Sequence, residues 1–368
     1  MIIKKIKFYN FRNYKQQEFQ FHSHINLVVG KNAQGKTNLI EGIYLLSLAK
    51  SFRTRINKEM IFFDEPFVRI DGLIETKKRN KELSFILSHE GKRAKIDGLE
   101  ISKTSEFVGQ LNVVVFTPDD LALIKGSPAI RRKFIDIELS KVNKRYLYSY
   151  NQYLSLLKER NSYLKKLNMG NQFKGDEYLT VLSEQMTEIQ VYLISERVKF
   201  IQNIYKFAKE IYKEISLDKE VLSVEYNCYY DIESDNLYQV ILERYQKNLL
   251  RDIRYNQTTD GIHRDDLIFK LDTREAGLYA SQGQQRSIVL ALKIGLLSCI
   301  YQEIGEYPVL LLDDVLSELD SIRRKQLLNL INEDIQIFIT TTNIDKLEYE
   351  ILKNAKTFQI EEGKLKGG

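Results

Sequence analysis

The eight residues GKNAQGKT, Gly30 to Thr37, follow the apolar run INLVV and precede a segment whose apolar residues have helical spacing. They match the phosphate-binding pattern Gly-x-x-x-x-Gly-Lys-Thr in a strand–loop–helix context. Glycine has no Cβ, so backbone amides can wrap closely around a phosphate, and the following helix directs its N-terminus at the anion. The stretch therefore predicts a P-loop. A simple glycine turn would leave the lysine and the threonine unexplained.

Each position of the loop has an expected role. Lys36 supplies a positive charge to the outer phosphates, and the Thr37 hydroxyl is an expected ligand of Mg²⁺. The residues expected to hold ATP are Gly30, Lys31, Asn32, Ala33, Gln34, Gly35, Lys36, Thr37 and Asn38.

A second pattern, VLLLDDVLSELD, places two carboxylates at the end of a buried strand. Adjacent carboxylates repel each other unless a cation lies nearby. We expect Asp313 in the Mg²⁺ shell, directly or through water. We expect Asp314 to face the γ-phosphate and polarise the attacking water. The alternative is a strand that runs into an acidic turn, and the P-loop disfavours it.

A third segment, YASQGQQRS, stands about thirty residues before the acidic strand, at an expected helix start. Ser281, Gly283 and Gln284 resemble the signature motif of ABC-type ATPases, in which this helix N-terminus meets the γ-phosphate bound to the other subunit. A hydroxyl, bare amides and a helix dipole suit that negative charge. An ordinary N-cap at Ser281 is the alternative. On the ABC interpretation Asp314, Lys36 and Ser281 are catalytic and Ser281, Gly283 and Gln284 also bind nucleotide.

Further segments fit this order of motifs but depart from it in detail. Ser317 to Asp320 resembles the D-loop, and one of Thr340, Thr341 and Thr342 falls where ABC ATPases carry a switch histidine. Asp314 is one methylene shorter than the usual glutamate. Our hypothesis is therefore that hydrolysis is slow and that ATP acts mainly as a dimer clamp. For the Q-loop, Gln110 is a poor candidate and the segment TPDD is the alternative.

The remaining patterns predict an α/β protein. Alternating residues over 68–101 predict an antiparallel sheet, and apolar strands that alternate with helices from about Leu267 predict a parallel sheet. Between them lie two long helical segments, 129–167 and 176–216, joined by a turn. We expect an ABC-type ATPase head, with a mixed or parallel sheet plus an antiparallel sheet, and an inserted α-helical lobe. The expected segments are 1–125 and 257–368 for the head and 126–256 for the mainly helical lobe.

Composition adds weaker constraints. The net charge of +5 permits a nucleic-acid partner without requiring one. Cys228 and Cys299 are far apart in the sequence, which argues against a disulfide framework or a zinc site and favours a reducing compartment. Because we find no signal peptide and no apolar run of membrane-span length, we expect a cytoplasmic protein without a membrane partner.

With these motifs placed, the chain resembles the RecF family of bacterial recombinational-repair proteins. Similar segments are NFRNY at 10–14, KSFRT at 50–54, Phe116 to Asp136, and DGIHRDDL at 260–267. The resemblance implies a weak ATPase that uses ATP and Mg²⁺ and dimerises with ATP. It also implies binding to double-stranded DNA and to double-strand/single-strand junctions, together with RecR and RecO, where RecA is loaded. The resemblance further implies an SMC-like head with a short helical lobe.

Some assignments stay open at this point. Arg12 is expected to reach the nucleotide phosphates, with a solvated turn residue as the alternative. Arg53 could touch phosphate or DNA, and His263 and Arg264 could be structural. Basic turns would give DNA contacts to phosphates with steep salt dependence and little sequence preference. The alternative functions are the motor subunit of an ABC transporter and a small-molecule P-loop kinase.

Overall fold

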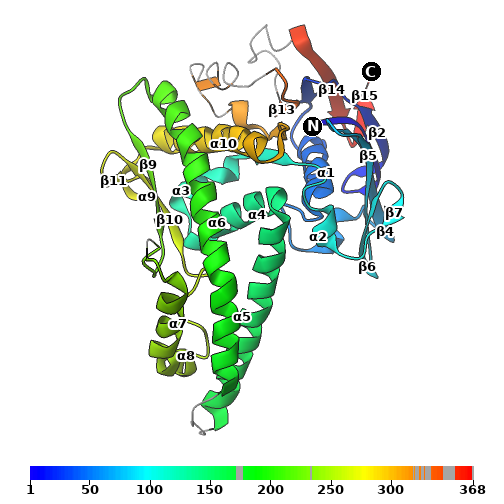
Figure 1. Cartoon of the computed structure of the whole chain (residues 1–368). Coiled ribbons are helices and arrows are strands. Elements are labelled where there is room, and N and C mark those ends of the chain that lie inside the picture. The colour runs from blue at the N-terminus through cyan, green and yellow to red at the C-terminus, as the bar shows by residue number, and fades with distance from the viewer. Residues whose placement is uncertain are drawn as a thin grey trace. The chain divides into compact units, whose positions relative to one another are not determined.

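The computed structural model describes residues 1–170, 177–232, 234–317, 319, 323–324, 327, 333–342 and 353–366 (Figure 1). The chain divides into two compact units. Unit 1 consists of Met1–Asp120, Glu210–Asp218 and Arg286–Gly368, and unit 2 consists of Leu121–Lys209 and Lys219–Gln285. Because residues 257–285 group with the helices of unit 2, the units differ from the segments 1–125, 126–256 and 257–368. That three-segment division stays a prediction about domains.

One sheet of unit 1 is antiparallel, with the strand order β2-β1-β4-β5-β6-β7. Burial alternates along β4 and β5, so one face of this sheet is buried and the other is not. The antiparallel sheet predicted for residues 68–101 is confirmed. The strands are β1 (Ile2–Phe11), β2 (Tyr14–Gln20), β4 (Phe67–Glu75), β5 (Asn80–Ser88), β6 (Gly91–Ile96) and β7 (Leu99–Glu100).

The other sheet of unit 1 has the order β15-β14-β3-β13-β12-β8 and is parallel from β14 to β8. Strands β12 and β13 are buried along their whole length, as parallel strands covered on both faces are. Their carboxyl ends lie at one edge together with that of β3. The strands are β3 (Ile25–Val29), β8 (Val113–Phe116), β12 (Val309–Leu312), β13 (Ile337–Thr341), β14 (Ala355–Glu361) and β15 (Lys364–Lys366).

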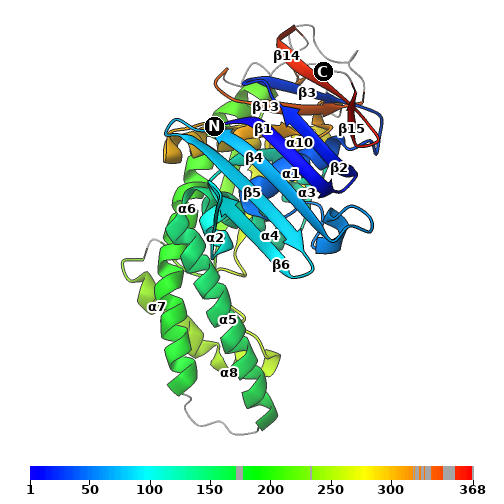
Figure 2. The same ribbon diagram turned by 90° about the vertical axis from the view of Figure 1, so that its right-hand side faces the viewer.

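Helix α1 (Lys36–Leu48) lies between these two sheets. It contacts β1, β4 and β5 of the antiparallel sheet and β8 and β13 of the parallel one, and Figure 2 shows it behind the antiparallel strands. Leu39, Ile43 and Leu46, expected to share one buried face, are fully buried, but so are Ile40 and Leu45 on other sides. The helix is therefore apolar all round, because both of its flanks are covered.

Unit 1 also contains several short helices. They are η1 (Asn57–Met60), α2 (Thr104–Phe107), most of η2 (Pro118–Leu121) and η3 (Val315–Ser317).

Long helices dominate unit 2. Helix α6 (Glu177–Ser216) matches the predicted 176–216 segment, and α5 (Lys144–Gly170) runs beside it in both ribbon views. The rings of Tyr163 on α5 and Tyr178 on α6 lie 4.8 Å apart. Part of the expected turn at 168–176 lies outside the described residues, as does most of the helix expected at 321–331. The other helices are α3 (Ala122–Lys125), α4 (Pro128–Val142), α7 (Leu237–Lys247), α8 (Leu249–Tyr255) and α9 (Ala276–Tyr279).

The helical segment predicted at 129–167 is not continuous. Helix α4 ends at Val142 and α5 begins at Lys144, with Asn143 in an extended conformation between them. The Asn143 side chain accepts a hydrogen bond from the Tyr146 amide at 2.9 Å, as an N-cap does. The asparagine therefore ends one helix and begins the next.

A small antiparallel sheet in unit 2 corrects a second expectation. The segment LIFKLD forms β10 (Asp266–Leu271), which pairs with β9 (Leu222–Asn227) and β11 (Arg274–Glu275) instead of joining the parallel sheet. Burial alternates along β10, which is typical of a sheet with one covered face. Strand β9 was not expected from the sequence.

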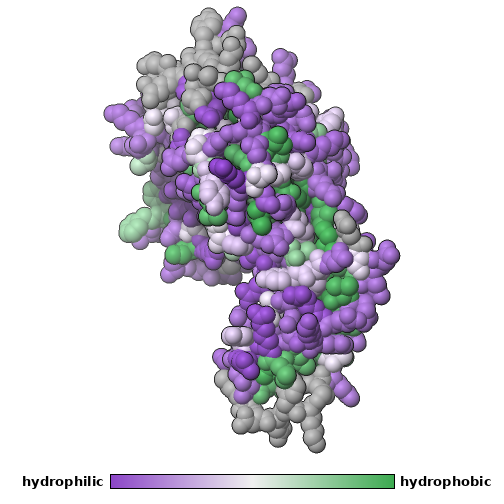
Figure 3. Space-filling model, turned by 90° about the vertical axis from the view of Figure 1, so that its left-hand side faces the viewer, coloured by the Kyte–Doolittle hydropathy of each residue, from purple (hydrophilic) through white to green (hydrophobic). Residues whose placement is uncertain are grey.

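Helix α10 (Gln282–Ile304) is, among the described residues, the one helix long and apolar enough to cross a membrane. The expectation that no apolar run reaches this length was therefore wrong by length and composition. However, 72% of its most apolar window is buried, as in the core helix of a soluble protein, so this is weak evidence for a span. On the coloured part of the face in Figure 3, apolar residues lie scattered among polar ones.

The close packing of α1 generates a stability prediction. A Cβ on Gly42 would lie 2.2 Å from Cε1 of Phe8, whose ring stacks on those of Phe11 and Tyr14. Alanine should gain about 1 kcal/mol in helix propensity, but overpacking costs roughly 1–3 kcal/mol. We expect Gly42→Ala to lower the melting temperature in a thermal unfolding scan. Phe8→Leu should relieve part of that loss in the double variant, and an unchanged or higher melting temperature for Gly42→Ala would contradict the packing argument.

Candidate nucleotide-binding site

The loop between β3 and α1 has the backbone that a phosphate cradle needs. A Cβ on Gly30 would lie 2.4 Å from the carbonyl oxygen of Ile360, and Gly35 has φ of +120°. Ala33 is also left-handed, with φ of +63°. Both glycines are therefore required by close approach or by conformation, and the first turn of the helix follows directly.

The Lys36 side chain is buried and folds back over the loop. Its Nζ atom donates to the carbonyl oxygens of Gly30 at 2.8 Å and Lys31 at 3.1 Å. Among the described residues no side chain caps the N-terminus of α1, and the first turn contains no acid. A positive side chain and an uncapped helix start fit a phosphate group.

The carboxyl ends of β12 and β13 bring the acidic pair to the loop. Thr37 Oγ1 donates to Asp313 Oδ1 at 3.0 Å, and Thr340 Oγ1 donates to the same oxygen at 2.8 Å. The Asp314 amide donates to Thr340 Oγ1 at 2.8 Å, and Asp314 has a left-handed φ of 54°. Thr340 is thus the member of the threonine run that contacts both acidic residues.

The electrostatics of Asp313 suit a cation. Burial raises the pKa of this carboxyl above its usual value. The hydrogen bonds from Thr340 and Thr37 lower it, the neighbouring Asp314 raises it again, and Arg53 lowers it. A cation beside the carboxylate would favour its charged form. The described residues contain no group of three or more acids, histidines and cysteines arranged to hold a metal, so phosphate and water oxygens would have to complete a Mg²⁺ shell.

Two turns brace the P-loop from outside, and the sequence did not reveal them. Asn13 Nδ2 donates to the Gln34 carbonyl at 2.8 Å, and the Tyr14 hydroxyl donates to the Gly35 carbonyl at 2.8 Å. From the β14–β15 turn, the Glu362 amide donates to Gln34 Oε1 at 2.6 Å. The NFRNY segment was noted for its resemblance, but no role followed from it. The order of strands β1, β2 and β14 is what brings these groups to the loop.

A buried carboxylate on α1 holds the two arginines named from the sequence. Glu41 is fully buried and accepts from Arg12 at 2.7 and 2.9 Å, from Arg53 at 3.2 Å and from Ser51 at 2.5 Å. Arg53 also donates to Asn38 Oδ1 at 2.8 Å. In this structure Arg12 is therefore paired with Glu41, and its contact with phosphate stays a prediction. A lone acid in an apolar helix was the signal that would have pointed to Glu41.

The signature segment belongs to unit 2, whereas the P-loop and the acids belong to unit 1. Ser281 stands at the start of α10 as its N-cap: the Gln284 amide donates to its Oγ at 3.3 Å, and its own amide donates to Gln284 Oε1 at 2.6 Å. This reciprocal pair is a capping box. The N-cap interpretation thus holds, and it leaves the phosphate role of Ser281 and Gly283 as a prediction.

Two smaller predictions differ in how the structure bears on them. Gln110 precedes β8 and its side chain bonds Lys81 and the Glu106 carbonyl, at the end opposite the carboxyl edge. The TPDD segment follows the carboxyl end of β8, where Asp120 pairs with the buried Lys293. Of the D-loop, Glu318 and Asp320 lie outside the described residues. Ser317 Oγ donates to the Asp314 carbonyl at 2.6 Å.

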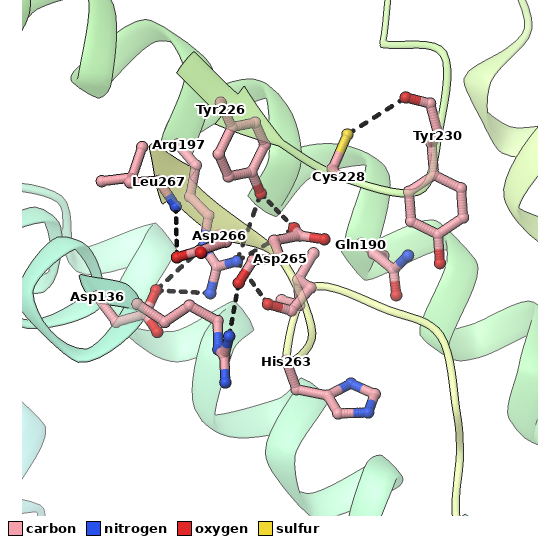
Figure 4. Close-up of polar contacts among 12 residues, drawn as sticks. Asp136, Gln190, Arg197, Tyr226, Cys228, Tyr230, His263, Asp265, Asp266 and Leu267 are labelled. Carbon is pink, nitrogen blue, oxygen red and sulfur yellow. Dashed lines mark hydrogen bonds and ion pairs between the residues drawn. The ribbon is translucent and has the colours of Figure 1, made fainter. Parts of the chain in front are cut away.

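A buried ionic network occupies the inner end of the β9–β10 pair in unit 2. Figure 4 shows Arg197 between two carboxylates, with Asp136 at 2.8 Å and Asp265 at 3.4 Å. Tyr226 donates to Asp265, and burial raises the pKa of that carboxyl to about 6. The DGIHRDDL segment therefore has a structural role in this unit, because a buried arginine needs such partners.

His263, in the same segment, is a satisfied neutral histidine. Its Nδ1 lies 2.8 Å from the Tyr153 hydroxyl and its Nε2 lies 3.0 Å from the Thr258 carbonyl, which fits the tautomer protonated on Nε2. Burial lowers its pKa to about 4, and Arg264, Arg132 and Arg197 lower it too, against the hydrogen bond to Thr258. No catalytic role follows from this position.

An ABC-type ATPase head is the class of protein that this fold and this loop–acid geometry define. A family model described as the RecF/RecN/SMC N-terminal domain matches residues 2–365. A curated relative named DNA replication and repair protein RecF, from Latilactobacillus sakei, is 40% identical and covers 99% of this chain and 98% of its own. The chain of Lactobacillus acidophilus with the same name is 41% identical, with the same coverage. The chain belongs to the RecF family.

Solved structures agree with that assignment. The structure of the recombination mediator protein RecF with ATP, in the RecFOR pathway, is 34% identical with a TM-score of 0.91, covering 99% of this chain and 97% of that one. An Smc head bound to the C-terminal winged helix of ScpA has 15% identity and a TM-score of 0.56, covering 100% of this chain and 97% of that one, and shows the fold alone. None of these relatives is a transporter subunit, so they do not support the transporter alternative.

The two perturbed groups of unit 2 predict opposite pH effects. The unfolded state takes up a proton on histidine below about pH 6.5, while folded His263 stays neutral down to about pH 4, so stability is lost as pH falls through this window. Folded Asp265 keeps its proton up to about pH 6, so its contribution is lost as pH rises from about 4 to 6.

We therefore expect His263→Gln to gain stability relative to the wild type as pH falls from 6.5 to 4.5, by up to about 3 kcal/mol. Denaturant titrations at several pH values measure this difference. A pH-independent offset reflects lost contacts and does not count. A flat difference across the window would show that His263 is not held neutral.

Proposed function

We propose that this chain is an ATP-dependent DNA-binding protein of recombinational repair, in which ATP drives dimerisation and the dimer binds duplex DNA near single-strand gaps. The observation that carries the proposal is the contact of Thr37 with Asp313, 276 positions apart in the chain and 3.0 Å apart in space. A P-loop hydroxyl and a strand-end carboxylate at this distance are what a magnesium nucleotide requires. Membership of the RecF family and the similarity to RecF with ATP support it.

In the proposed site, the amides of the loop and Lys36 bind the phosphates of ATP. Thr37 and Asp313 would hold Mg²⁺, which neutralises phosphate charge when bound. Asp314 orients water on the γ-phosphate side. Because Asp314 is short and Thr340 stands where a histidine is usual, we infer weak ATPase activity that serves mainly as a dimerisation switch.

The second half of the site comes from another copy. Ser281 and Gly283, at the helix start in unit 2, would meet the γ-phosphate held by the P-loop of the partner copy. The hydroxyl of Ser281 accepts from Gln284, and a hydroxyl that accepts keeps its own proton for donation. Two composite sites then form in one dimer, and ATP is the link in each.

The proposed partners follow from the family. The similar structures are titled as members of the RecFOR pathway, so RecR and RecO are the expected protein partners and RecA loading the expected outcome. Duplex DNA and its junctions with single strands are the expected nucleic-acid partners. The cytoplasm is the expected location, and no membrane partner is proposed.

Two variants test the composite site together. Lys36→Met should abolish ATP binding, and Ser281→Arg should keep ATP binding but block dimerisation, because a large cation replaces the hydroxyl. Sedimentation velocity with ATP and Mg²⁺ measures both. When the two variants are mixed, a heterodimer with one intact site should form, since the Ser281→Arg copy has a sound P-loop and the Lys36→Met copy a sound signature. An ATP-induced dimer of Ser281→Arg alone would overturn the proposal.

The DNA partner has its own test. The wild type with ATP should bind a duplex more tightly than without ATP, and the logarithm of its affinity should fall linearly with the logarithm of salt, by about 0.9 per phosphate contacted. Lys36→Met should lose the ATP-dependent part. Fluorescence anisotropy with a labelled duplex of two unrelated sequences measures this. Affinity that is equal with and without ATP, or strongly sequence-dependent, would contradict the proposed clamp.

A further inference from the structure

Glu220 reaches the signature segment from a distant part of the sequence. It stands between the end of α6 at Ser216 and the start of β9 at Leu222, and its carboxylate accepts a hydrogen bond from the side-chain amide of Gln284, 64 residues further on. Both residues are half-buried members of unit 2. No sequence pattern marks Glu220, because it lies outside every motif.

The amide of Gln284 has two ends with different partners. Its oxygen accepts from the Ser281 amide at 2.6 Å, and its NH₂ group donates to Glu220. If the amide turned over, its NH₂ would face the Ser281 N–H and its oxygen would face a carboxylate, and both contacts would be repulsive. Glu220 therefore fixes which end of the amide meets Ser281.

That orientation in turn fixes the Ser281 position at the start of α10. The capping box holds the serine backbone through Gln284 Oε1 and the serine hydroxyl through the Gln284 amide. A hydroxyl held as acceptor points its own proton outward as a donor. We propose that Glu220 is a positioning residue of the signature segment, which orients Gln284 so that Ser281 is preset to bind the phosphate of a second copy.

This inference rests on the proposed function, and it makes an unusual electrostatic prediction. A carboxylate next to a phosphate-binding helix start works against the anion, so a purely electrostatic view says that Glu220→Lys should strengthen ATP-driven dimerisation. Positioning says the reverse, because an ammonium group beside the Gln284 NH₂ forces the amide away. Glu220→Gln keeps an acceptor oxygen without the charge, and it should therefore preserve the arrangement.

The experiment measures the protein concentration at half-dimerisation by sedimentation with saturating ATP and Mg²⁺. We expect Glu220→Lys to raise it roughly tenfold, in the range that loss of a helix cap produces, and Glu220→Gln to change it less than about threefold. Glu225→Lys is the matched control, since Glu225 is an exposed acid on the adjoining strand β9 that pairs with Lys270. ATP affinity of the monomer and the melting temperature should match the wild type in Glu220→Gln.

The outcomes separate the two levels of the proposal. If Glu220→Lys dimerises as tightly as the wild type or more tightly, while Ser281→Arg does not dimerise, the positioning role is overturned and the composite site stands. If Glu220→Gln is as weak as Glu220→Lys, the acceptor mechanism is overturned. If the wild type fails to dimerise with ATP, or Ser281→Arg dimerises, the composite site itself fails and the role of Glu220 fails with it.

Discussion

Parallel pairing of β3, β13 and β12 is the constraint on which the nucleotide site depends. In a parallel arrangement all carboxyl ends lie at one edge, so whatever follows each strand meets its neighbours there. The P-loop follows β3, Thr340 lies near the end of β13 and the two aspartates follow β12. A shift of one residue in any register would turn Thr340 away from Asp313, because side chains alternate along a strand.

The surroundings of the P-loop then decide how well its shape is held. A glycine-rich loop loses much conformational entropy when it is fixed, so it needs partners outside itself. Asn13, Tyr14 and Glu362 provide them through hydrogen bonds to Gln34 and Gly35. The buried Glu41 provides an electrostatic counterpart. Two arginines share one carboxylate, which leaves one net positive charge next to the residues expected to bind a polyanion.

The sequence predicted what is local and missed what is made by distant residues. The P-loop, the acidic strand end and the 40-residue helix α6 each depend on a short pattern, so the strand–loop–helix context and the helix bounds came out well. The break at Asn143 was missed because one capping side chain outweighs a favourable helical pattern on both sides. Strand β10 was assigned to the wrong sheet because alternation does not say which strand is the neighbour.

The site residues divide in the same way. Thr37 and Asp313 could be paired from motifs, since the motif order fixes the strand ends that carry them. Glu41 and Glu220 could not, because each gains its role from partners brought in by another element. The pairing of Arg12 shows the same limit from the other side. A basic residue in a family-like segment suggested a phosphate contact, and only the fold shows a buried acid within reach of it.

The hydrogen-bond arrangement at Thr340 also argues about chemistry. A threonine hydroxyl has one proton, and here that proton goes to Asp313 while a lone pair accepts the Asp314 amide. The hydroxyl therefore stabilises the acidic pair and has no second proton to donate to a γ-phosphate. A histidine in the same position could hold one partner and still donate to another. The arrangement thus favours a site that binds the nucleotide firmly and turns it over slowly, which is what a switch between monomer and dimer requires.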